Sequence, residues 1–115
     1  MRFFNKKELQ QAAADLRAGA EVIERNGWHQ GDYYKRVEGL SIRDCPVCAA
    51  GALSVAVANL PLPRISNRLT NALQALQEHV HAFSVGNWND QEEQTAENVI
   101  KTIRECADRL EAGGW

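Results

Sequence analysis

Two cysteines, Cys45 and Cys48, open the most apolar stretch of the chain. The run from Val47 to Ala58 predicts a helix, and Cys48 falls in its first turn. A thiol at that position faces unpaired backbone N–H groups and the positive end of the helix dipole, so we expect its pKa to fall. Four roles are open: a nucleophile, half of a redox pair, a metal ligand, or a buried structural cysteine.

The Cys45-Pro46-Val47-Cys48 motif is similar to the redox motif of thioredoxin-like proteins, which place it between a strand and a helix. No strand is expected here. A zinc site would need two further ligands, and His79 and His81 would point to different sides of a helix. Because free cysteines are so often buried, we expect reduced structural thiols, with no metal and no cofactor. A redox or metal module at Cys45 and Cys48 remains an alternative.

A cysteine-dependent enzyme is the other alternative. It would use Cys48 as the nucleophile, one of the three histidines as the base, and Asn89 or Asp90 to orient that base. Such constellations are recognised by geometry rather than by position in the chain, so the sequence leaves this hypothesis open.

Two further blocks combine an aromatic side chain with short polar ones. Trp88-Asn89-Asp90 is typical of a tight turn entering a helix, because Asn and Asp bond local backbone while Trp buries its ring. In Gly27-Trp28-His29-Gln30-Gly31, the tryptophan directly follows a helix stop and is expected to cover the core.

All three blocks sit at helix ends, and a bundle of antiparallel helices gathers alternate ends at one pole. We therefore expect Trp28, Cys48 and Asn89-Asp90 to lie together. Asp90 is expected to accept hydrogen bonds from N–H groups near Cys48 or from the backbone of the preceding connection.

The elements that must position these blocks are four helices, and nothing indicates a strand. Asn5 with Glu8 forms a capping-box signal for the first helix, which Gly27 ends. The remaining three are a central apolar helix at about 46–59, a helix capped by Ser66 that continues to Val80, and a helix capped by Thr95 that ends before Gly113-Gly114. The prediction is one all-α domain over residues 1–115, a compact bundle around helix 46–59.

The connection at residues 28–43 is long for a structureless loop, so we expect it to pack on the body or to have a role, and residues 35–42 could form a short hairpin. Composition excludes other classes. A net charge of −2 with scattered basic residues argues against nucleic-acid binding. The chain shows no secretory signal pattern and no apolar run long enough for a bilayer, so we expect a cytoplasmic protein without a membrane partner.

Taken together, the three blocks resemble a family of small uncharacterised domains found in actinobacteria and their phages. The family pattern has G-W-x-x-G ending a first helix, C-A-x-G-A opening a second, and W-N-D before a threonine-capped last helix. The corresponding residues here are Gly27, Trp28 and Gly31; Cys48, Ala49, Gly51 and Ala52; Trp88, Asn89 and Asp90; and Thr95. The resemblance implies a shared fold and three shared blocks, but no activity.

The function expected from these observations is a small non-enzymatic interaction or ligand-binding module for a protein or small-molecule partner. The resemblance adds an accessory role in a phage or mobile element. The expected pocket residues are Trp28, Gly31, Cys48, Trp88, Asn89 and Asp90.

Overall fold

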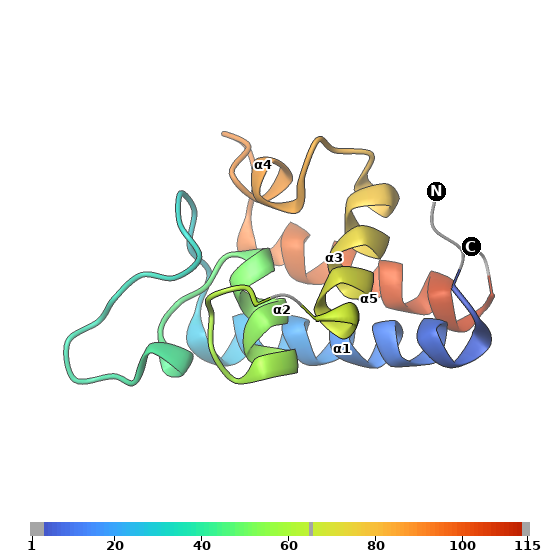
Figure 1. Cartoon of the computed structure of the whole chain (residues 1–115). Coiled ribbons are helices and arrows are strands. Elements are labelled where there is room, and N and C mark those ends of the chain that lie inside the picture. Colours follow the sequence, from blue (N-terminus) through green and yellow to red (C-terminus); the bar gives the residue numbers. More distant parts are fainter. Residues whose placement is uncertain (1–3, 65, 114–115) are drawn as a thin grey trace.

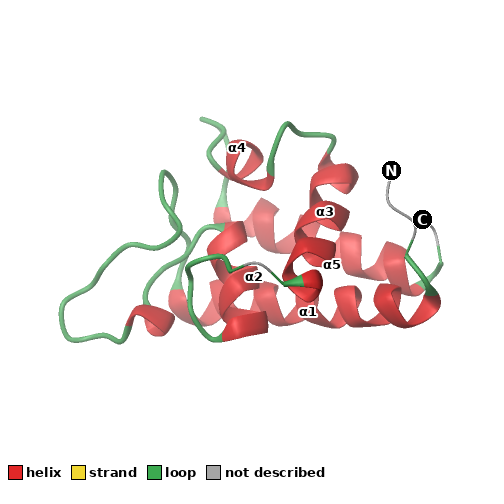
Figure 2. Ribbon diagram, viewed as in Figure 1, coloured by secondary structure: helices red, strands yellow, loops and turns green. Residues whose placement is uncertain are grey.

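A computed structural model describes residues 4–64 and 66–113 and shows an all-α bundle (Figures 1 and 2). Its elements are α1 (Lys6–Asn26), a 3-10 turn η1 (Ile42–Asp44), α2 (Ala49–Ala58), α3 (Asn67–Val80), α4 (Val85–Asn89) and α5 (Ala96–Glu111). The described residues contain no strand, only two isolated bridges to Val47. The predicted fold class is confirmed. No helix in these residues combines the length and apolarity needed to cross a membrane.

Local side chains start the helices where the sequence predicts. Asn5 and Glu8 form a complete capping box, in which each side chain accepts a hydrogen bond from the other residue's backbone N–H. Ser66 and Thr95 accept hydrogen bonds from N–H groups in the first turns of α3 and α5. The C-terminal stop of α1 lies at Gly27, as expected. Of the predicted stop after α5, Gly113 follows the helix end, whereas Gly114 lies outside the described residues.

Helix α1 is the long base of the bundle. It runs antiparallel to α5 and also contacts α2 and α3 (Figure 1). The helices enclose a core of fully buried side chains that includes Leu16 and Ile23 of α1, Leu53 of α2, Leu76 of α3 and Ile103 of α5. Every residue of α2 from Ala49 to Val55 is buried, as expected for an apolar helix surrounded by others.

The start of α2 differs from the prediction. The helix begins at Ala49 rather than near position 46, and Cys48 is its N-cap. The backbone of Val47 stays extended because its N–H donates to Gly27 O at 3.0 Å and its carbonyl accepts from His29 N at 2.9 Å. The carbonyl of Pro46 accepts from Lys35 N at 2.9 Å. These long-range bonds hold residues 46–47 against the connection and out of the helix.

Two other local predictions are wrong. Trp88 and Asn89 belong to the short helix α4, capped by Ser84, rather than to a turn, and Asp90 is the C-cap. Residues 35–42 do not form a hairpin. Their chain reverses at a turn in which Leu40 N donates to Val37 O, and η1 follows.

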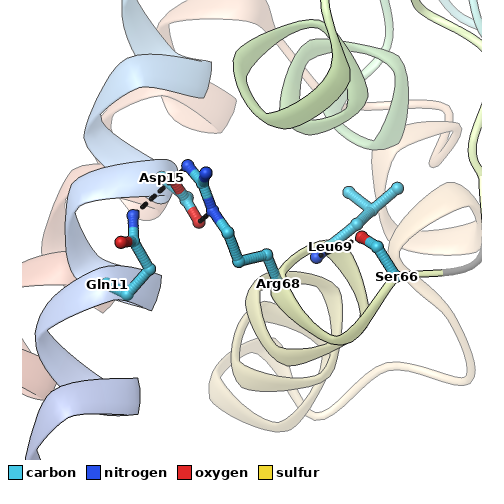
Figure 3. Close-up of polar contacts among 5 residues, drawn as sticks. All are labelled: Gln11, Asp15, Ser66, Arg68 and Leu69. Carbon is cyan, nitrogen blue, oxygen red and sulfur yellow. Dashed lines mark hydrogen bonds and ion pairs between the residues drawn. The ribbon is translucent and has the colours of Figure 1, made fainter.

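A partly buried ion pair joins α1 to α3 (Figure 3). The carboxylate of Asp15 is 4% exposed and accepts two hydrogen bonds from the guanidinium of Arg68, at 2.6 and 3.2 Å. Gln11 donates a third at 3.1 Å. The Asp15 carboxylate is therefore almost fully enclosed, whereas the Arg68 side chain stays 51% exposed and keeps contact with solvent. The hydrogen bonds that Arg68 donates to Asp15 raise the pKa of Arg68.

Gly51 lets the connection approach α2 closely. A Cβ atom built on Gly51 would collide with the carbonyl oxygen of Tyr33. That same carbonyl accepts a hydrogen bond from Cys48 N at 3.1 Å, so it cannot move away without losing a bond at the start of α2. The absence of a side chain at position 51 is thus a packing requirement.

We predict that Gly51→Ala lowers the free energy of unfolding by about 1–3 kcal/mol, because the added methyl group must displace backbone. Gly86→Ala is the matched control, since a Cβ there meets nothing nearer than Ser84 Oγ at 3.9 Å. Urea unfolding of both variants measures the difference. A Gly51→Ala protein as stable as the Gly86→Ala protein would contradict the close approach.

Candidate functional site

The structure brings the three sequence blocks together at one end of the bundle, as predicted. Trp28 Nε1 donates to Asn89 Oδ1 at 2.8 Å, which joins the first block to the third. Ala49 N, directly after Cys48, donates to the same oxygen at 2.9 Å. Residues 61 and 40 positions from Asn89 in the chain therefore meet at its side-chain amide.

Asn89 is the centre of this arrangement. Its side chain is fully buried, and its amide uses both acceptor sites and both N–H donors. The two donors reach His29 O at 3.1 Å and Asp90 Oδ1 at 3.0 Å. The Asn89 backbone carbonyl accepts from Gln30 Nε2, which also donates to Gln91 O. The sequence identified Asn89 as a pocket residue, but neither its central role nor the contribution of Gln30 was predicted.

Asp90 holds the connection rather than the helix. Its Oδ1 accepts a hydrogen bond from Gly31 N at 3.0 Å, so the predicted bond to the connecting backbone is confirmed. The N–H at the start of α2, beside Cys48, goes instead to Asn89. The Asp90 side chain remains exposed, whereas its neighbour Asn89 is buried.

The Cys48 thiol is 4% exposed and caps α2, with Sγ accepting a hydrogen bond from Gly51 N at 3.3 Å. Burial raises the pKa of this thiol above its ordinary value, although backbone hydrogen bonds from Gly51 and Ala50 act in the opposite direction. The charge of Asp90 raises the pKa further. The predicted fall in the pKa is therefore wrong. The cost of removing the thiolate from water is larger than the stabilisation that the N-terminal end of the helix gives it.

Cys45, His79 and His81, considered above as partners for Cys48, have contacts of their own. Cys45 is fully buried and its Sγ donates to Ser41 O at 3.5 Å. All three cysteines are free thiols. His79 faces Arg109 of α5, with 3.4 Å between Nδ1 and Nη1, and His81 caps the end of α3. Among the described residues, no three His, Cys, Asp or Glu side chains gather as a metal site would require.

A pocket of about 220 Å³ opens beside Cys48. Its lining residues are Gly31, Asp32, Tyr33, Cys48, Gly86 and Asp90. Three of the six predicted pocket residues therefore line it. The other three, Trp28, Trp88 and Asn89, do not line it, and Asn89 bonds segments that do. Sequence reasoning missed Asp32, Tyr33 and Gly86, whose only signal was their closeness in sequence to Gly31 and Trp88.

We expect Asn89→Ala to lower the free energy of unfolding by about 2–4 kcal/mol, because Trp28 Nε1, Ala49 N and His29 O each lose a buried partner. Asn87→Ala is the matched control, since Asn87 lies in the same helix with an exposed side chain. Thermal unfolding monitored by circular dichroism compares the two. Equal stability of the two variants would remove Asn89 from its central role.

The raised pKa of Cys48 predicts slow alkylation. Iodoacetamide should label Cys48 more slowly than it labels N-acetylcysteine amide at neutral pH, since only the thiolate reacts. The labelling rate should keep rising at pH values where the free thiol is already ionised. Mass spectrometry of the peptide containing Cys48 gives the rate, and rapid labelling at neutral pH would show an activated thiol instead.

Comparison with known proteins identifies one family for the chain. No curated protein and no solved structure shows significant similarity to the chain. The model of a family of unknown function, DUF6197, matches residues 7–109, a range that covers α2, α3, α4 and nearly all of α1 and α5. The chain belongs to this family.

Proposed function

We propose that the chain is a non-enzymatic binding module that takes a cationic group, such as an alkylammonium, into the pocket beside Cys48. The observation that carries the proposal is the pocket itself, because it has two carboxylates, Asp32 and Asp90, and no basic side chain in its lining. Complementary charge is the usual basis for recognising such a group.

Both carboxylates are arranged with an oxygen to spare. Asp32 Oδ1 accepts from Tyr33 N at 2.8 Å, and Asp90 Oδ1 accepts from Gly31 N and Asn89 Nδ2. The Oδ2 atom of each residue has no hydrogen-bond partner in the described part of the chain. Backbone bonds thus orient the carboxylates before a ligand arrives, which reduces the entropy lost on binding.

The rest of the lining suits an aliphatic stem. Tyr33 is 42% exposed and supplies aromatic surface, while Cys48 and Gly86 add small uncharged surface. An ammonium on a short alkyl chain, either as a free amine or as a lysine side chain of a partner protein, matches this combination of acids and apolar surface.

The cysteine-enzyme alternative receives support from one fact, that Cys48 and Asp90 line the same pocket. It receives less support than binding, because burial raises the pKa of the thiol and no described histidine lines the pocket. For the redox alternative, Cys45 would have to leave its bond to Ser41 O before pairing with Cys48.

The proposal also includes a cytoplasmic location, since three free thiols suit a reducing compartment. The resemblance of the three blocks to domains of actinobacteria and their phages supports an accessory role in a phage or mobile element. The partner would then be a host or phage protein that presents a lysine, or a small amine.

The test uses n-butylammonium and N-acetyl-lysine amide as probes, followed by amide chemical shifts in NMR titrations. We expect saturable shifts at Gly31, Tyr33 and Gly86, and we expect Asp90→Asn to weaken the binding by about fivefold or more. Asp44→Asn removes an exposed carboxylate outside the pocket and should change the affinity little.

Binding of the amine alone would indicate a small-molecule ligand, and binding of both probes would indicate a lysine side chain. Butyrate provides the opposite charge on a similar chain and should not bind. Equal binding of butyrate, or shifts that are the same in Asp90→Asn and wild type, would overturn the proposal.

A further inference from the structure

The loop at residues 35–43 extends away from the helices and forms an end of the molecule (Figures 1 and 2). In sequence it lies between the pocket residues Tyr33 and Cys48, but none of its own residues lines the pocket. The function proposed above leaves this loop without a role.

The loop is anchored at both ends. Lys35 N donates to Pro46 O at 2.9 Å at one end. At the other, Asn26 Nδ2 donates to Arg43 O at 2.7 Å and to Cys45 O at 3.2 Å. The chain reverses at Gly39, where φ is +87°, a conformation that glycine adopts without strain. A loop held in this way presents its side chains in a defined arrangement.

The charge of the loop is opposite to that of the whole chain. It contains three basic residues, Lys35, Arg36 and Arg43, and one acidic residue, Glu38, in a chain of net charge −2. All three basic side chains are exposed, and none forms an ion pair within the described residues. By contrast, Arg17, on α1, pairs with Asp108 and Glu111 of α5.

The turn of the loop also exposes apolar surface. Leu40 is 49% exposed, one of few large hydrophobic side chains in the described residues with that much surface open to solvent. A leucine flanked by unpaired basic residues matches an acidic segment that carries an apolar side chain. Binding to nucleic acid calls for a broad basic face. Binding to an anionic membrane calls for a cluster of about four to eight basic residues. Three basic residues are too few for either.

We propose that the loop at residues 35–43 is a second binding surface, which recognises an acidic, apolar-containing segment of a partner protein. The basic side chains accelerate the encounter, and Leu40 supplies the contact that excludes water. This surface is separate from the pocket beside Cys48 and does not depend on the ligand proposed for it.

The probe is a fluorescein-labelled peptide, Glu-Glu-Phe-Glu-Leu-Glu-Glu, titrated with the full chain and followed by fluorescence anisotropy. We expect Lys35→Glu/Arg36→Glu to weaken binding by about tenfold, and Leu40→Ser by about threefold. Arg25→Glu/Lys101→Glu changes the net charge equally at exposed positions on α1 and α5 and should weaken binding by less than about twofold.

Three results would overturn the proposal: no binding by the wild-type chain, equal losses in the two double variants, or tighter binding of duplex DNA or of phosphatidylserine-containing vesicles than of the peptide. Titration of the Lys35→Glu/Arg36→Glu variant with n-butylammonium distinguishes an effect on the loop from an effect on the pocket. Unchanged amine binding with lost peptide binding supports the second surface, whereas loss of both would show a damaged fold and refute it.

Discussion

The buried amide of Asn89 is the interaction on which the arrangement of this domain depends. It ties the connection at Trp28 and His29 to the first N–H of α2 and to Asp90, so three segments that share no secondary structure are held by one side chain. A buried amide with every donor and acceptor used is stabilising only while all its partners remain in place. The pocket and the start of α2 therefore form one cooperative unit.

Two opposing effects act on the pKa of the Cys48 thiol, and their balance determines the direction in which that pKa shifts. The N-terminal end of α2 favours a thiolate, because hydrogen bonds from Gly51 N and Ala50 N lower the pKa of the thiol. Burial and the nearby Asp90 carboxylate disfavour it and prevail. The carboxylate that we propose to contact a cation also raises the pKa of the Cys48 thiol, which disfavours the nucleophilic thiolate. The proposed cation binding and thiol catalysis are therefore alternatives at this site.

The features that could be predicted from the sequence are those that short-range interactions determine. The caps at Asn5, Ser66 and Thr95 each need only residues within the next turn, and they were predicted at the correct positions. The late start of α2 was not predictable, because Val47 is kept extended by bonds to Gly27 and His29. Local pattern also could not decide which of two adjacent short polar residues turns inward. The inward one is Asn89, which can donate and accept, whereas a carboxylate can only accept.

The extended backbone at Val47 has a consequence for the order of folding. Two N–H groups at the start of α2 gain their acceptors only when the connection and α4 have docked, because Cys48 N donates to Tyr33 O and Ala49 N donates to Asn89 Oδ1. The latter contact spans 40 residues, and the Trp28–Asn89 contact spans 61. Contacts so distant in sequence form slowly, after the entropy of closing the intervening chain has been lost. The start of α2 and the pocket beside it depend on these contacts, so they are expected to be completed late in folding.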